Sequence, residues 1–373
     1  MAPTSLEPKQ EGKLPLRFDI EKLVLRSVGP GKAMAFTAKL DNAKPPGLID
    51  SAGSFGPWQR DDPGATAVSG NYSFQNADLG AFKGISGTLS STGKYRGVLE
   101  QIEVDGQTDT PQFALKRGGE PVHLATTFHT LVDGINGNTR LDPVEAKFLH
   151  SEFICQGSVA REPGSPGKTV SLEAVTTQAR IEDILWLVMG TSQPMLTGGV
   201  DFKSQILIPP GPQEILDKLK LDGQFGIRYA QFASPEVKAR IKTLSDRARG
   251  ITKKDEQEGE EAAEIVPSNF RGRFKLDGGT ASFAHLAFDV PGARITLAGD
   301  YNLESQQIDM QGVFQMQATL SKTQAGVKHW ILKPFDPLFK KDGAGFEVPI
   351  FISGTKDHPD IQAEVFHKHF TIH

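Results

Sequence analysis

Four consecutive runs between Asn269 and Ser321 alternate apolar and polar residues with a period of two. In the first run the apolar positions are Phe270, Gly272, Phe274 and Leu276, and the polar positions are Arg271, Arg273 and Lys275. A period of two is that of a β-strand with one side facing water. A change of phase near Ala284 in the second run predicts a β-bulge. This stretch therefore predicts antiparallel strands joined by tight turns.

Glycines occupy mid-strand positions on the apolar side of these and other runs, at Gly157, Gly223, Gly272, Gly299 and Gly312. Glycine in a strand marks a bend or a close approach to the backbone. We therefore expect a sheet that curls around its apolar side and leaves space inside. The alternative is a packed sandwich core in which the glycines mark bulges, and the sequence leaves both open.

Composition favours a sheet-rich protein that does not bind nucleic acid. The 41 Lys and Arg against 45 Asp and Glu give a formal charge of -4, which argues against nucleic acid as the main partner. The 39 glycines and 24 prolines indicate many turns. No window approaches the roughly 18 apolar residues of a membrane span, and residues 1–13 lack the pattern of a signal peptide. The one cysteine, Cys155, is interpreted as a small buried residue.

The chain is expected to fall into four segments: a disordered tail at 1–13, the first part of a β-groove with helical insertions at 14–250, a mobile acidic loop at 251–267, and a last β-region at 268–373. Apolar spacing predicts a helix over Ile181–Met189. Ser234-Pro235 is expected to begin a basic amphipathic helix. Residues from Asn42 to Pro63 are rich in Pro, Gly and Asp and predict a loop.

A search for catalytic motifs finds none. The sequence has no Gly-x-Ser-x-Gly elbow, no His-Glu-x-x-His, no Cys-x-x-Cys and no phosphate-binding loop. His367, His369 and His373 near the chain end lack a carboxylate partner, so they are interpreted as solvated rather than as a metal site. We therefore expect no catalytic residues, no metal and no cofactor, and a protein that is not an enzyme.

The C-terminal third contains a series of short motifs: Phe274-Lys275-Leu276-Asp277-Gly278-Gly279, Val290-Pro291-Gly292-Ala293, Leu297-Ala298-Gly299, Tyr301-Asn302-Leu303, Lys333-Pro334-Phe335-Asp336-Pro337-Leu338-Phe339, Gly343-Ala344-Gly345, Val348-Pro349-Ile350, Ile352-Ser353-Gly354-Thr355 and His358-Pro359. With these motifs the chain resembles the AsmA family of bacterial envelope proteins. The likeness is clearest over Ser268 to Asp360 and looser from Asp61 to Tyr229. The motifs are mostly structural, so they bear on fold more than on cellular role.

The resemblance implies a relative of TamB and of the bridge-like lipid transfer proteins, with a long, strongly curved antiparallel β-sheet whose apolar trough carries phospholipids between membranes. It implies a periplasmic protein held at the inner membrane through a segment absent from this chain. Phospholipids would be the main ligands, and inner- or outer-membrane proteins further partners. The family supplies no catalytic residues to transfer.

The leading hypothesis is a non-enzymatic β-groove that holds or conducts acyl chains. Its expected lining is Phe153, Phe225, Ile227, Phe270, Phe274, Leu276, Phe283, Phe288, Ile295, Leu297, Tyr301, Met310, Phe314 and Met316. The alternative is a structural adaptor for outer-membrane protein assembly that acts through its strand edges. A carbohydrate-binding β-solenoid would need clustered aromatic residues, and only 3 Trp and 4 Tyr are present.

Overall fold

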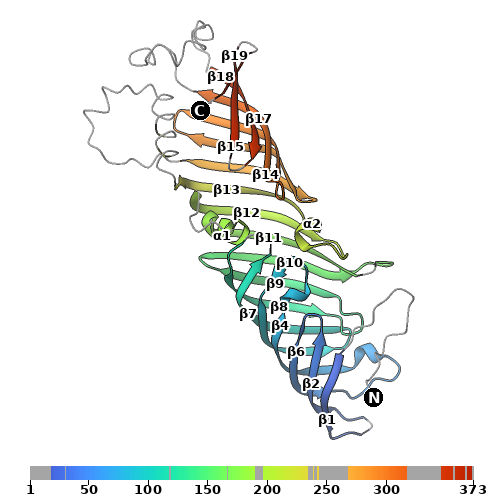
Figure 1. The fold of residues 1–373 in the computed structure, drawn as a ribbon. Helices are drawn as coiled ribbons and strands as arrows, with labels where there is room; N and C mark the ends of the chain where they lie inside the picture. Colours follow the sequence, from blue (N-terminus) through green and yellow to red (C-terminus); the bar gives the residue numbers. More distant parts are fainter. Residues whose placement is uncertain are drawn as a thin grey trace, which may run out of the picture. The chain divides into compact units, whose positions relative to one another are not determined.

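The computed structural model describes residues 18–29, 31–116, 119–165, 167–189, 196–233, 238, 242, 268–316, 346–355, 358–365 and 368–371. The chain divides into two compact units. Unit 1 comprises Met1–Ala179, Asp183–Ser192 and Lys203–Lys220, and unit 2 comprises Arg180–Glu182, Gln193–Phe202 and Leu221–His373. Both units are built from antiparallel strands (Figure 1). The predicted mainly β fold with a few short helices is confirmed.

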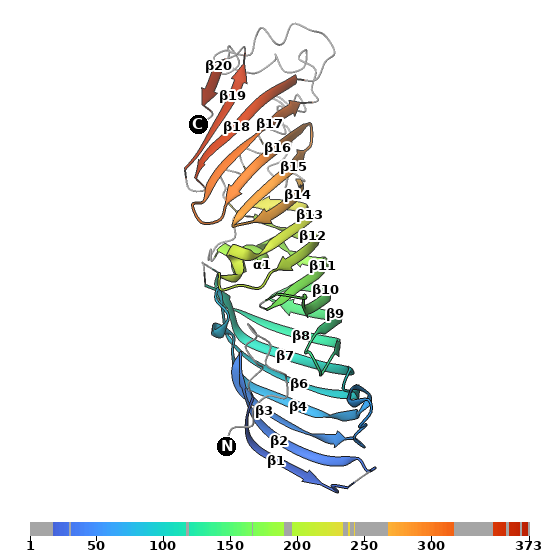
Figure 2. The same ribbon diagram turned by 90° about the vertical axis from the view of Figure 1, so that its right-hand side faces the viewer.

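In unit 1 the strands lie side by side in one layer and bend along their length (Figure 2). They are β1 (Phe18–Arg26), β2 (Met34–Ala43), β3 (Pro46–Phe55), β4 (Ala67–Asp78), β5 (Ile85–Ser86), β6 (Thr88–Val98), β7 (Gln101–Leu115), β8 (Val122–Val132), β9 (Thr139–Phe148), β10 (Ser151–Arg161) and β11 (Lys168–Arg180). Neighbours in sequence pair antiparallel, except that β4 pairs with β6 while short β5 pairs with the end of β7. Apart from β5, the strands of unit 1 thus form a meander, which a chain rich in tight turns favours.

Unit 2 repeats this plan with β13 (Lys220–Phe232), β14 (Asn269–Asp277), β15 (Thr280–Val290), β16 (Ala293–Asn302), β17 (Gln307–Met316), β18 (Phe346–Thr355), β19 (Pro359–Val365) and β20 (Lys368–Thr371). Each pairs antiparallel with the next. Strand β12 (Leu196–Ile208) is divided between the two units after Phe202. The register of β15 against β16 shifts between Phe283 and Leu286, which flank Ala284, so the predicted bulge is confirmed.

Helices are short in the described residues. Helix α1 (Ile181–Met189) has the predicted bounds, and α2 (Ile215–Lys218) is a single turn. Two 3₁₀ turns, η1 and η2, cover Pro63–Ala65 and Leu79–Ala81. Of the predicted basic helix, Lys238 and Lys242 are described and helical. The rest of that helix, the tail at 1–13 and the loop at 251–267 lie outside the described residues.

The predicted loop from Asn42 to Pro63 is wrong, because β3 occupies Pro46–Phe55 in its middle. The small residues that suggested a loop are needed by the sheet. A Cβ at Gly53 would lie 2.0 Å from the carbonyl oxygen of Ser69 on β4. The glycine at position 53 thus reflects the close approach of β4 and not a turn of the chain.

Candidate functional site

The apolar sides of β13 to β18 align across unit 2. Residues directly opposite each other in an antiparallel sheet point to the same face. One row runs through Ile227, Phe270, Phe288, Ile295, Phe314 and Val348, the next through Phe225, Gly272, Leu286, Leu297, Gly312 and Ile350, and a third through Gly223, Phe274, Phe283, Gly299, Met310 and Ile352. These three rows are called the unit 2 apolar face.

Phenylalanine rings contact one another along one end of this face. The chain of ring contacts, with centroid separations of 5.5–6.3 Å, runs through Phe202, Phe274, Phe225, Phe270, Phe288 and Phe232. The Phe202–Phe274 rings are stacked, and the other pairs are tilted or edge-on, which are favourable aromatic geometries. All six side chains are only half-buried. The rings therefore pack against each other while part of each remains open to solvent.

Five residues of the unit 2 apolar face are fully buried: Ile227, Gly272, Leu286, Val348 and Ile350. Val348 and Ile350 are buried, and Ile295, Leu297 and Phe314 pack against them. The phenylalanines in the three rows stay half-buried. The described strands from β13 to β20 belong to one sheet, in which each pairs with the next.

The opposite side of the same strands carries ion pairs. Asp289 accepts from Arg271 at 3.1 Å and from Arg294. Lys275 lies 3.2 Å from Asp222 on the neighbouring strand. The Lys275–Asp222 pair is exposed on both sides and contributes little to stability. The ion pairs place charged groups on one side of the sheet, whereas the three rows on the other side contain no charged residue.

Three predicted curvature glycines lie where the backbone of the next strand leaves no room for a side chain. A Cβ would lie 1.8 Å from the Thr296 oxygen at Gly312, 2.1 Å from the Asp309 oxygen at Gly299, and 2.1 Å from the Ser171 oxygen at Gly157. Gly299 and Gly157 also have φ of 148° and 147°. Such positions are open to glycine alone. They let the strands coil closely against one another.

Gly272 does not leave the open space that the sequence predicts. A Cβ there would lie 2.8 Å from Leu286 Cδ1 and 3.0 Å from Phe225 Cε1. The ring of Phe225, directly opposite on β13, covers the glycine. Gly223 is half-buried in β13 opposite Phe274. The space above Gly272 is thus filled by the side chains of Phe225 and Leu286, and no cavity is left there.

The other predicted lining residues fall at separate places. Tyr301 joins a neighbouring row with Leu276 through Ala281. Met316 lies in β17 opposite Ala293. Phe153 belongs to unit 1, where its ring stacks on Phe148 at 5.6 Å. Phe153 is therefore the one predicted lining residue that does not belong to unit 2.

Unit 1 has a corresponding face, which sequence reasoning did not identify as a site. Tyr72 on β4 and Tyr95 on β6 lie over glycines of neighbouring strands, and their hydroxyls contact Ser91 and Ser51. Burial raises the pKa of both phenols, while the serine contacts lower it less. The mid-strand Gly70 was the one sequence feature that could have indicated this face. That Tyr95 lies over Gly70 could not be inferred without knowing that β4 pairs with β6.

No family model, curated protein or solved structure matches this chain. The likeness to the AsmA family therefore stays a prediction from the motifs in the sequence.

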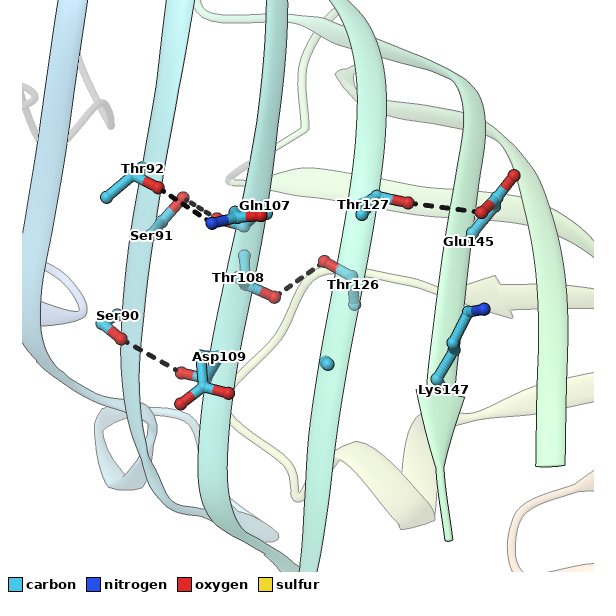
Figure 3. A pocket seen from close by; sticks show the side chains of 11 residues that line it. Ser90, Ser91, Thr92, Gln107, Thr108, Asp109, Thr126, Thr127, Glu145 and Lys147 are labelled. Carbon is cyan, nitrogen blue, oxygen red and sulfur yellow. Dashed lines mark hydrogen bonds between the residues drawn. The ribbon is translucent and has the colours of Figure 1, made fainter. Parts of the chain in front are cut away.

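The polar side of unit 1 holds a shallow depression of about 320 Å³ (Figure 3). It surrounds Ala125, which lies opposite Asp109 on one side and Lys147 on the other. Hydroxyl, amide and carboxylate groups line it, and some of their mutual hydrogen bonds are long, such as Thr127 Oγ1 to Glu145 at 3.4 Å. It has the chemistry of a solvated strand surface.

Other site types find little support in the described part of the chain. There, no three His, Cys, Asp or Glu side chains come together as metal ligands. Within the same residues, no helix has the length and hydropathy to cross a bilayer. Cys155 is half-buried, and burial raises the pKa of its thiol. A thiol of raised pKa is a poor nucleophile, which agrees with its interpretation as a packing residue.

Proposed function

We propose that the unit 2 apolar face holds the acyl chains of phospholipids. The observation that supports this is the alignment of Phe, Ile, Leu and Met side chains, many of them half-buried, into rows across six consecutive strands, with charge confined to the other side. Each methylene removed from water is stabilised by about 0.8 kcal/mol. An uncharged row of partly exposed apolar side chains is therefore a favourable place for a hydrocarbon chain.

The dimensions of the face suit such a ligand. Six strands at about 4.8 Å spacing span about 24 Å. One leaflet of a bilayer provides about 15 Å of hydrocarbon, half the usual core thickness of about 30 Å. A single acyl chain lying along a row would thus be accommodated by the strands from β13 to β18. Rows that continue from strand to strand also allow a chain to slide.

The wider role follows from the AsmA likeness and is likewise a proposal. The chain would act in the bacterial periplasm, without catalysis, and pass phospholipids between membranes. Membrane proteins at either end would be its partners. The Phe274 to Gly279 motif that carries the likeness begins near the end of β14, where Phe274 belongs to the proposed binding face.

Two neighbouring residues on β14 provide the test. Phe274→Glu places a carboxylate on the apolar face, whereas Arg273→Glu changes charge on the exposed side of the same strand. Lipid extracted from the purified proteins is measured by mass spectrometry, and transfer is followed between liposomes. We expect lipid with the wild type and with Arg273→Glu, and roughly tenfold less with Phe274→Glu, since a charge placed among hydrocarbon is costly.

Wild-type protein that carries no lipid and transfers none would contradict the proposal. Equal lipid content in the two variants would also contradict it, because binding would then not involve this face. Crosslinks to β-barrel precursors in place of lipid would favour the adaptor function instead.

A further inference from the structure

Tyr95 extends across the neighbouring strand of unit 1. Its hydroxyl is 2.5 Å from where a Cβ would stand on Gly70 of β4. The same hydroxyl is 2.8 Å from Ser51 Oγ on β3, one strand farther. A side chain at Gly70 would meet both this hydroxyl and the backbone oxygen of Ala52, which is also 2.5 Å from the Cβ position. The phenol oxygen ends up over the middle of the sheet.

Tyr72 extends in the opposite direction, and its serine partner lies on the strand that it crosses. It leaves β4 and passes over Gly93 of β6, where a Cβ would lie 2.7 Å from its Cε1. Its hydroxyl is 3.0 Å from Ser91 Oγ and 2.9 Å from the Cβ position of Gly106 on β7. Two tyrosine–glycine–serine sets thus occur side by side on β3 to β7.

The hydrogen bonds fix the direction of the phenol protons. Ser51 Oγ donates to the carbonyl oxygen of Asn71 at 2.9 Å, and Ser91 Oγ donates to that of Gln107 at 2.9 Å. A serine hydroxyl has one hydrogen, so in each set the serine oxygen accepts from the tyrosine. Each tyrosine hydroxyl thus donates its hydrogen to a serine, and its oxygen can still accept a hydrogen bond from another group.

The side chains beside these oxygens are uncharged. The ring of Phe128 lies beside Tyr72, 2.6 Å from the Cβ position of Gly106, and Val104 lies opposite Tyr95. The charged residues of β6, Lys94 and Arg96, alternate to the exposed side. An ammonium group at the phenol oxygens would be unpaired and therefore costly to bury. A neutral donor would meet two acceptors without that cost.

We infer that the tyrosine-bearing face of unit 1 binds an amphiphile with a neutral hydroxyl group, whose O–H donates to Tyr72 Oη or Tyr95 Oη while its hydrocarbon chain lies on the same face. This inference rests on the proposed function, since it assumes that the sheet faces bind lipid. It adds a preference among lipids, set by unit 1, that the hydrocarbon rows of unit 2 do not provide.

Three probes with the same alkyl chain separate the possibilities: hexadecan-1-ol, hexadecyl methyl ether and hexadecylamine. Dissociation constants are measured by isothermal titration calorimetry on the full chain. We expect the wild type to bind the alcohol about three- to tenfold more tightly than the ether, the effect of one net hydrogen bond. The amine should bind no more tightly than the ether.

The variant Tyr72→Phe/Tyr95→Phe keeps both rings over their glycines and removes only the oxygens. We expect it to bind the ether as the wild type does and to lose the preference for the alcohol. Tyr229→Phe is the matched control, because Tyr229 is 70% exposed in unit 2, and it should keep the full preference. Far-ultraviolet circular dichroism checks that each variant is folded.

Equal binding of alcohol and ether by the wild type would overturn the inference and leave the proposed function standing. A preference that survives in the double phenylalanine variant would overturn it too, as would tightest binding of the amine. Failure of all three probes to bind would contradict the proposed function, and this inference with it.

Discussion

At Gly312 the carbonyl oxygen of Thr296 occupies the place that a side chain would need, 1.8 Å from the Cβ position. At Gly226 on β13 nothing lies within 4 Å of that position. Both glycines are in strands of the same unit, yet their roles differ. One allows a close approach of two backbones, and the other is replaceable.

We therefore expect Gly312→Ala to lower the free energy of unfolding by about 1–3 kcal/mol, the usual cost of overpacking. Gly226→Ala should change it by less than about 1 kcal/mol, because a methyl group has room there. Urea denaturation followed by circular dichroism measures both. Similar losses in the two variants would mean that strand contact does not explain the glycine at 312.

Residue-level features were predictable from sequence only where they follow from alternation along one strand. Phe270, Phe274 and Leu276 share a face because they are separated by even numbers of residues. The covering of Gly272 by Phe225 depends instead on which strand pairs with which, because these two residues are distant in sequence and directly opposite in the sheet. Alternation within a single strand carries no information on such pairing.

At the scale of elements, α1 is attached to unit 1 through a buried carboxylate. Asp183 accepts from Ser151 Oγ at 2.7 Å and from the backbone N–H of His150 at 2.9 Å. Both donors belong to the start of β10 and the turn before it. The backbone N–H of Glu120 also donates to the Trp186 oxygen at 3.2 Å. The helix is thus held by polar contacts to two connections of the sheet.

Asp183→Ala removes an acceptor for two donors, so we expect a loss of about 1–3 kcal/mol in unfolding free energy. Asp183→Asn keeps an acceptor oxygen and should lose less. Val188→Ala, at a residue that is 42% exposed, is the control and should have a small effect. The midpoint of urea denaturation compares the three. An Asp183→Ala midpoint equal to that of Val188→Ala would show that the carboxylate does not hold the helix.

Sequence predicted elements well where periodicity was long and poorly where small residues interrupted it. The spacing of Ile181, Ile184, Leu185 and Val188 located α1 correctly. Strand β3 was missed because Pro46, Gly47 and Gly53 weigh toward a loop. The close approach of β4 favours small residues there, and that approach is not visible in a local window.

At the scale of the whole molecule, the proposed function depends on the separation of apolar and charged side chains onto opposite sides of each sheet. Each unit is an antiparallel sheet whose strands alternate between a less polar side and a polar, ion-paired side. An ordinary sandwich would cover the apolar side with a second sheet. In the described residues of unit 2 the phenylalanines in the rows from β13 to β18 instead stay half-buried. Whether a lipid binds to them therefore decides between the proposed function and a purely structural role.

The most direct measurement is a photocrosslinking scan along β14. A photoreactive phenylalanine analogue replaces residues 270, 271, 273, 274 and 275 in turn, and Gly272 is left unchanged because a side chain has no room there. Crosslinked phospholipid is detected by mass spectrometry. We predict that positions 270 and 274 capture lipid and that 271, 273 and 275 capture little. Capture that is uniform along the strand, or absent at 270 and 274, would contradict lipid binding on the unit 2 apolar face.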